Sequence, residues 1–219
     1  MVTINTYIEL VPSLLNGAKI TIQVLVLSLI FTYMIAFIAG LGKLSKFKVI
    51  SVICTVYIEI FRGTSLLVQL FWIYFVLPFF GIEFSPLTAG VIAMSLCYGA
   101  YASEVVRGAI LSIPIGQTEA AIALNMTPFQ RMIRIIIPQA FKIMLPGFGN
   151  LSIELMKGTS LVSLITLGDL TYQSLTLRNT NVAHTTEIFV ALLVIYFLIA
   201  LPLIFFARWL ERRASIGRV

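Results

Sequence analysis

Long apolar stretches separated by short polar segments form the main pattern of this chain. Five of them cover about residues 20–41, 64–80, 87–111, 135–165 and 188–207. An α-helix needs roughly 20 mostly apolar residues to cross the hydrocarbon core of a bilayer. The pattern therefore predicts an all-α, polytopic membrane protein in which residues 1–219 form one transmembrane domain with about five membrane-spanning helices.

Composition indicates that lipid, not water, surrounds this chain. Of the 219 residues, 59% are hydrophobic and only 11% are charged, whereas a soluble domain carries roughly 25% charged residues. A surface so poor in charge would aggregate in water. No linker or second, polar domain interrupts the pattern, so we expect a single folded unit.

Basic residues gather beside the ends of apolar stretches and supply much of the net charge of +6. One group occupies 43–48 and another occupies 208–218. Loops rich in lysine and arginine stay on the cytoplasmic side of a membrane. With five spans, both groups and the 113–134 loop are cytoplasmic when the N-terminus is outside and the C-terminus is inside. No basic and aromatic face indicates a nucleic-acid partner.

The fourth apolar stretch is the least regular of the five. Prolines and glycines interrupt it at Pro138, Pro146, Gly147, Gly149 and Gly158. Irregular backbone at membrane depth is tolerated only where it is buried in protein or lines a water-filled cavity. The segment 146–165 is therefore the first candidate for a transport path.

Ionisable residues recur in the spans as an acid followed three residues later by a base. The pairs are Glu59 with Arg62, Glu104 with Arg107, and Glu154 with Lys157. This spacing allows each pair to meet on one helix face, and charges at membrane depth usually face the protein interior. The first two are either structural ion pairs or parts of a gate near the cytoplasmic side. The third either pairs internally or meets the two charges of a zwitterionic solute.

Turn and cap signals divide the 113–134 loop into two short helices. Thr118 is a suitable N-cap with Glu119 at the first helical position, where the helix dipole favours a carboxylate. Asn125 tolerates the left-handed conformation that ends a helix. Thr127 can cap a second helix with Pro128 at its first position. On this pattern alone, the loop is either an amphipathic connector or a docking element.

The loop also resembles the EAA motif of ABC importer permeases, which has a glycine four residues after EAA and an Ile-x-Leu-Pro ending. Glu119-Ala120-Ala121 matches its beginning, and Ile135 to Pro138 matches its end. Asn125 replaces the glycine, and asparagine is the best substitute in a left-handed turn. Ile137 replaces the leucine before the proline.

Three further segments are similar to permeases of polar amino acids, the histidine, glutamine and arginine type. They are Phe61 to Gln69, Tyr101 to Gly108, and Lys157 to Ser163. The resemblance implies a type I ABC importer permease in the plasma membrane of a prokaryote. It also implies a second permease copy or a paralogue, ABC ATPase subunits and an extracytoplasmic solute-binding protein as partners.

The family resemblance implies that the loop is the docking site for a separate ATPase. Glu119 would be its polar anchor, Ala120 and Ala121 would permit close approach, and Asn125 would end the helix. The chain has no G-x-x-x-x-G-K-S/T loop for phosphates, because its Gly42-Lys43 pair is followed by Leu44. We therefore expect that the chain is not an enzyme and that ATP and Mg²⁺ bind to the partner.

Our candidates for the substrate path are Glu154, Lys157, Gly158, Thr159 and Ser160. In relatives that carry basic amino acids, an aspartate stands at the place of Gly158, so its absence argues against a cationic solute. The segment 154–165 also resembles permeases of ectoine-type importers. We therefore expect the permease subunit of an ATP-driven importer for polar amino acids or a zwitterionic compatible solute such as ectoine.

A secondary transporter or channel subunit is the main alternative, and a membrane-embedded enzyme is a weaker one. Many secondary transporters consist of paired halves, which five spans do not form, and the EAA-like loop would be unexplained. An enzyme would need a nucleophile with a base, or a metal cluster. The sequence shows neither, because Cys54 and Cys97 lack CxxC spacing and His184 is the single histidine. The exact solute, and whether two identical or two different permeases pair, stay open.

Overall fold

The computed structural model describes the backbone of residues 4–215 and the side chains of residues 12–212. Within this range the chain is almost entirely helical and contains no β-strand, which confirms the all-α prediction. The α-helices are α1 (Ile4–Lys43), α2 (Lys48–Gly63), α3 (Leu66–Phe71), α4 (Pro86–Leu111), α5 (Ile115–Ala123), α6 (Pro128–Arg131), α7 (Ile137–Gly158), α8 (Leu170–Thr180) and α9 (Thr185–Ser215). Short π-helices, η1 (Trp72–Val76) and η3 (Met132–Ile136), and 3-10 helices, η2 (Leu77–Phe80), η4 (Thr159–Ile165) and η5 (Val182–His184), connect them.

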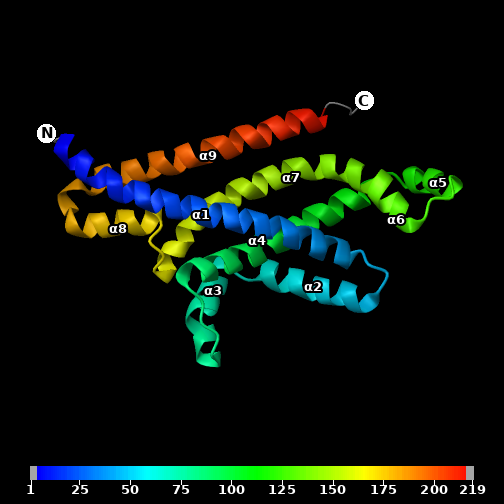
Figure 1. Ribbon diagram of the computed structural model, residues 1–219, viewed down its shortest axis with the longest axis horizontal. Helices are drawn as coiled ribbons and strands as arrows, with labels where there is room; N and C mark the ends of the chain where they lie inside the picture. The colour runs from blue at the N-terminus through cyan, green and yellow to red at the C-terminus, as the bar shows by residue number, and fades with distance from the viewer. Residues whose placement is uncertain (1–3, 216–219) are drawn as a thin grey trace.

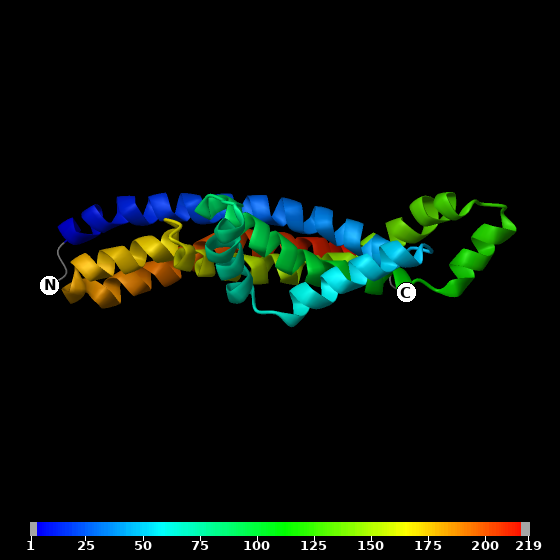
Figure 2. The same ribbon diagram turned by 90° about the horizontal axis from the view of Figure 1, so that it is seen from below.

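The molecule is elongated, and α1, α4, α7 and α9 run along its long axis (Figure 1). α4 lies between α1 and α7, and α9 packs against α7. α1 begins at one end of the molecule and α9 ends at the other. α5 and α6 extend beyond the remaining helices at the end where α1 finishes (Figure 2).

Four segments are long and apolar enough to cross a membrane: Pro12–Lys43, Pro86–Leu111, Pro128–Ile165 and Val182–Arg212. A fifth span is possible only as a bent pair, Lys48–Gly63 with Leu66–Phe80, whose axes differ by 105°. The apolar pattern of the sequence predicts the second span at about 64–80. In the structure, α2 is the helix that runs beside α1 and α4, while residues 66–80 leave the bundle sideways (Figure 1).

The bend between α2 and α3 is stabilised by the side chain of Gln69. Thr64 and Ser65 are extended, so the helix ladder is interrupted there. The buried Gln69 amide donates hydrogen bonds to the carbonyl oxygens of Phe61, at 3.0 Å, and Thr64, at 3.3 Å. These bonds satisfy acceptors that the break would otherwise leave unpaired at membrane depth, where an unpaired carbonyl is costly.

α4 is far more enclosed than α9. In its most apolar 18-residue window 67% is buried, compared with 6% for α9. Small residues permit this enclosure, because a Cβ at Gly99 would stand 2.8 Å from the side chain of Ile35 on α1. Such residues let helix backbones approach closely in membranes. α9 instead leaves Leu193 69% and Phe205 63% exposed, as expected for a face that meets lipid.

Candidate functional site

The loop between α4 and α7 forms two short helices, as predicted, but the first begins earlier than expected. α5 starts at Ile115 with Pro114 at the N-cap position, so the prediction of Thr118 as N-cap is wrong. A tertiary contact explains the extra turn, because the side chain of Gln139 on α7 donates to the side-chain oxygen of Gln117 at 3.2 Å. That bond holds the first turn of α5 against α7.

The end of α5 is a left-handed turn at Asn125, as predicted. Asn125 has a φ of 57°. Its N–H donates to the carbonyl of Ile122 at 2.8 Å, and the N–H of Met126 donates to the carbonyl of Ala121 at 3.0 Å. These two bonds form a Schellman motif, which satisfies the last carbonyls of a helix.

The second short helix is capped by Thr127, again as predicted. Thr127 and Gln130 form a capping box, in which the Gln130 N–H donates to Thr127 Oγ1 at 3.3 Å and the Thr127 N–H donates to Gln130 Oε1 at 3.0 Å. Pro128 occupies the first helical turn, where its missing N–H leaves no bond unmade. The end of α5 and the start of α6 are therefore determined by local hydrogen bonds.

Most of the residues predicted to dock on an ATPase are exposed at the surface of α5. Glu119 and Ala120 are exposed, whereas Ala121 is 3% exposed and faces its own chain, where α5 packs on η3. This end of the molecule also exposes four large apolar side chains, those of Ile115, Ile122, Leu124 and Phe129. Close approach at Ala121 therefore serves the packing of the loop itself.

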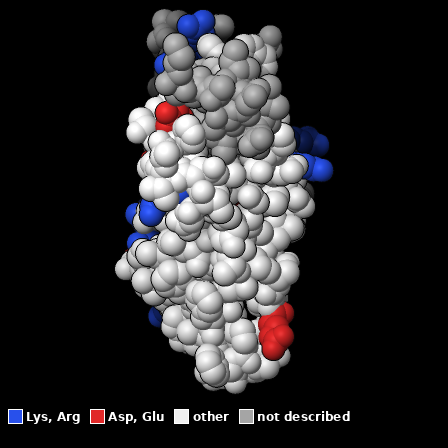
Figure 3. Space-filling view, turned by 90° about the vertical axis from the view of Figure 1, so that its left-hand side faces the viewer, with Lys and Arg blue, Asp and Glu red and all other residues white. Residues whose placement is uncertain are grey.

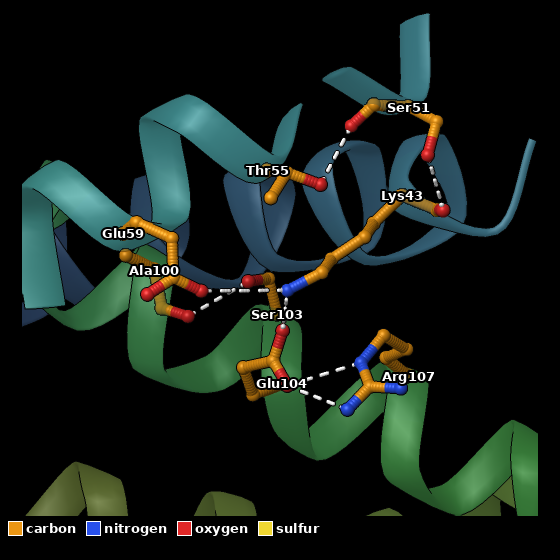
Figure 4. Close-up of polar contacts among 8 residues, drawn as sticks. All are labelled: Lys43, Ser51, Thr55, Glu59, Ala100, Ser103, Glu104 and Arg107. Carbon is orange, nitrogen blue, oxygen red and sulfur yellow. Dashed lines mark hydrogen bonds and ion pairs between the residues drawn. The ribbon is translucent and has the colours of Figure 1, made fainter. Parts of the chain in front are cut away.

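Four charged side chains meet where α1, α2 and α4 come together (Figure 4). The Lys43 ammonium donates to Glu104 Oε1 at 2.8 Å and lies 3.8 Å from Glu59 Oε1. The Arg107 guanidinium binds the other oxygen of Glu104 at 2.9 Å. The predicted pair of Glu104 and Arg107 is therefore present. Lys43, which the sequence marks only as one of the basic residues of the 43–48 loop, is the centre of the cluster.

The predicted ion pair of Glu59 with Arg62 is absent from the described residues. Glu59 points toward Lys43 instead (Figure 4). Arg62 lies over the aromatic ring of Tyr101, with its guanidinium carbon 5.5 Å from the ring centroid. The Tyr101 hydroxyl also donates to the Arg62 carbonyl at 3.3 Å. Helical spacing permits this ion pair, but each residue contacts a residue of another helix instead: Glu59 contacts Lys43 of α1, and Arg62 contacts Tyr101 of α4.

The predicted ion pair of Glu154 with Lys157 is also absent from the part of the chain that the structure describes. Both are exposed. Lys157 and Ser160 line a groove of about 840 Å³ between α7 and α9. The Glu154 carbonyl faces α4 instead, where it accepts a hydrogen bond from the Tyr98 hydroxyl at 3.1 Å.

Gly158 and Thr159 form the junction between α7 and η4. A Cβ at Gly158 would lie 2.5 Å from the Tyr98 hydroxyl oxygen, so this position permits the close crossing of α7 and α4. Thr159 is buried, and its hydroxyl donates to the Met156 carbonyl at 2.6 Å. Ser160 bonds the Lys157 carbonyl at 2.9 Å. These hydroxyl groups bind carbonyls of the last turn, where the helix changes to 3-10 geometry.

Sequence reasoning missed a buried acid at the start of α8. Asp169 is fully buried and caps α8 through bonds from the N–H groups of Thr171, at 3.1 Å, and Tyr172, at 3.0 Å. Burial raises the pKa of Asp169, while these donors act in the opposite direction. The Tyr196 hydroxyl of α9 lies 3.4 Å away. An aspartate directly before a helix is an N-cap signal that could have identified this residue.

Comparison with known proteins agrees with this architecture. Residues 32–216 match the family of binding-protein-dependent transport system inner membrane components. A probable amino-acid ABC transporter permease of Sinorhizobium fredii is 49% identical over 93% of this chain and 87% of its own length. The glutamine transport system permease GlnP of Escherichia coli is 38% identical over 94% of both chains.

Solved structures extend the likeness to three dimensions. The crystal structure of an amino acid ABC transporter with histidines contains a chain with a TM-score of 0.88 and 34% identity, matched over 97% of this chain and 99% of that one. An inward-facing MetNI methionine ABC transporter has a TM-score of 0.68 at 19% identity, matched over 90% and 95%, and supports the fold alone. The chain belongs to the binding-protein-dependent transport system inner membrane family and is the permease subunit of an amino-acid ABC importer, in which ATP hydrolysis takes place on a separate subunit.

Proposed function

We propose that this permease imports a compact zwitterionic solute, such as a neutral polar amino acid or ectoine. The observation that carries the proposal is the contact between Gly158 and Tyr98. A side chain at position 158 would meet the Tyr98 hydroxyl at 2.5 Å. The aspartate associated with permeases of basic amino acids therefore does not fit at this position unless Tyr98 moves.

One acid and one base of α7 lie near this junction. Glu154 and Lys157 are both exposed near the end of α7, and they are not paired with each other. A zwitterion brings one group of each sign, so both of its charges can be compensated when it loses water. A net cation such as arginine would need a second acid there.

The names of the relatives support an amino-acid solute without choosing one. The permeases named for L-cystine and glutamine transport are 38% identical to this chain, and the arginine permease ArtQ of Bacillus subtilis is 35% identical. These values are too similar to separate the solutes. The proposal therefore depends on Gly158 and on the charge balance near it.

Solute-stimulated ATP hydrolysis of the reconstituted importer tests the solute class. Glutamine and ectoine are compared with arginine, and we expect arginine to give the weakest stimulation. Gly158→Asp should shift the preference toward arginine when Tyr98→Phe removes the hydroxyl that blocks the site. Gly158→Ala with Tyr98→Phe is the matched control, because it adds the Cβ without the charge. A clear preference of the unmodified protein for arginine would overturn the proposal.

We also propose that α5 docks on ABC ATPase subunits, and that a second permease copy or a paralogue and an extracytoplasmic solute-binding protein complete the importer. Glu119 and Ala120 are exposed on α5, and Leu124 at its end is 74% exposed. A helix that carries exposed leucine and isoleucine beside an acid is suited to a protein partner whose groove has a basic rim.

The same end of the molecule is proposed to be cytoplasmic. Lys43 ends α1, Arg134 lies in η3, and Arg208 lies near the end of α9, so these basic residues share the end that carries α5 (Figure 1). The opposite end shows mainly uncharged residues among those that are coloured (Figure 3). By the positive-inside rule, α1 then begins outside and α9 ends in the cytoplasm.

Two variants test docking and orientation. Glu119→Arg should abolish co-purification with the ATPase, whereas Glu83→Arg, at another exposed acid in the turn before α4, should not. Normal transport by Glu119→Arg would refute the docking site. In a background without Cys54 and Cys97, a cysteine at Thr180 should be labelled in intact cells and one at Leu124 only after permeabilisation. The reverse labelling would refute the orientation.

A further inference from the structure

Lys43 is the member of the charge cluster that joins different helices. Glu104 and Arg107 both belong to α4, so their contact holds nothing together beyond one helix turn. Lys43 ends α1 and reaches both Glu104 on α4 and Glu59 on α2. The ammonium is mostly enclosed, with 19% of the side chain exposed.

We infer that Lys43 is a positioning residue for transport, which exchanges its ammonium between Glu104 and Glu59 and so transmits movement of α4 to α2. The inference rests on the proposed docking of α5 on an ATPase. α4 ends at Leu111, and α5 begins at Ile115, so a displacement of α5 reaches α4 through three residues. Glu59 lies on α2 one turn before Gly63, where the chain bends by 105° into α3.

Two glycines beside Lys43 make this junction close enough for the exchange. A Cβ at Gly40 would stand 2.8 Å from the Ser103 carbonyl on α4. A Cβ at Gly42 would collide with the Cys54 sulfur on α2. The last turn of α1 therefore touches α4 through one glycine and α2 through the other, with Lys43 directly after them.

The distances favour one partner without excluding the other. Lys43 is in hydrogen-bond contact with Glu104 at 2.8 Å, while Glu59 is 3.8 Å away and its side chain is 65% exposed. If Lys43 leaves Glu104, that carboxylate keeps both bonds from Arg107, at 2.9 and 3.0 Å. If Lys43 leaves Glu59, water solvates the exposed carboxylate. Neither arrangement leaves a buried carboxylate without a partner, so the exchange should cost little free energy.

The test uses the complete importer with its ATPase and solute-binding protein in proteoliposomes. Lys43→Met keeps the length of the side chain and removes its charge, and Lys43→Arg is the conservative control. We expect Lys43→Met to assemble with the ATPase and to hydrolyse ATP, but to import at least about fivefold less solute per ATP, in the range of ordinary coupling effects. Lys43→Arg should restore most of that ratio.

Glu59→Gln separates exchange from simple stabilisation. It leaves the contact of Lys43 with Glu104 intact, so a purely structural role predicts an unchanged ratio of solute to ATP, whereas exchange predicts a lower one. A wild-type ratio in Glu59→Gln, or an unchanged ratio in Lys43→Met, would overturn the inference. Failure of docking is recognised separately, because Glu119→Arg loses the ATPase while Lys43→Met retains it.

Discussion

Two acid–base pairs of identical spacing lie in opposite environments in this permease. Glu104 and Arg107 are ion-paired at 2.9 Å, and Glu104 is only 18% exposed. Glu154 and Lys157 are exposed and unpaired with each other. A pair three residues apart on a helix contributes only about 0.2–0.5 kcal/mol, so spacing permits pairing but does not enforce it.

The difference comes from the neighbouring helix. Lys43 of α1 supplies Glu104 with a second cation, so the enclosed carboxylate has a donor on each oxygen. No basic side chain in the described part of the chain reaches Glu154, and Lys157 lines the groove toward α9. The first pair is therefore part of the packing of three helices, whereas both members of the second are exposed and unpaired with each other.

The largest expected effect concerns Glu104. Glu104→Gln removes the carboxylate that holds Lys43 and Arg107, so it should lower the free energy of unfolding by about 2 kcal/mol. This value is below the cost of breaking a fully buried pair because the site is partly open to water. Thermal unfolding of the purified protein in detergent measures the change. An unchanged midpoint would mean that the cluster does not contribute to stability.

A smaller effect on stability is expected for the contact of Arg62, which lies over the ring of Tyr101 and does not form the predicted ion pair with Glu59. Tyr101→Leu should lower the free energy of unfolding by about 1 kcal/mol, because a partly exposed cation–π contact is worth about 0.5–1 kcal/mol and a hydrogen bond goes with it. Tyr101→Phe, which keeps the ring, should lose less. Tyr172→Leu is a control, since Tyr101 and Tyr172 are both 38% exposed. If Tyr172→Leu lowers the free energy of unfolding as much as Tyr101→Leu does, the contact of Arg62 with Tyr101 makes no specific contribution to stability.

The smallest effect on stability, and a large effect on transport, is expected for the unpaired residues. Glu154→Gln and Lys157→Met should each change the free energy of unfolding by less than about 0.5 kcal/mol, as exposed positions usually do. Both should reduce solute uptake. If either variant destabilises the protein as much as Glu104→Gln does, the contrast between the two pairs is wrong.

Local signals predicted the α5 loop well because local hydrogen bonds determine most of it. The left-handed residue at Asn125 and the cap at Thr127 need only neighbours within a few residues. The start of α5 could not be predicted this way. Gln139, which holds Gln117, is 22 residues away along the chain, and no local pattern predicts that the two side chains meet.

Gln69 shows a related limit. It is a polar residue in an apolar stretch, and its amide satisfies backbone carbonyls where a helix breaks. A pattern of apolar residues shows where helices are long enough to span a membrane. It does not show that α2 bends by 105° into α3, because the bend is stabilised by one side chain of α3 that bonds the carbonyls of Phe61 near the end of α2 and of Thr64 in the break.

The amino-acid sequence was sufficient to predict that the chain is helical, that it lies in a membrane, and that it belongs with the permeases of ABC importers. Those properties follow from apolar length, charge placement and short motifs, each of which acts over a few residues or through the solvent. The pairing of charges from different helices became known from the three-dimensional structure. Ion pairs between helices depend on distances of 3–4 Å between residues such as Lys43 and Glu104, 61 positions apart, and only the packing of α1 on α4 brings them together.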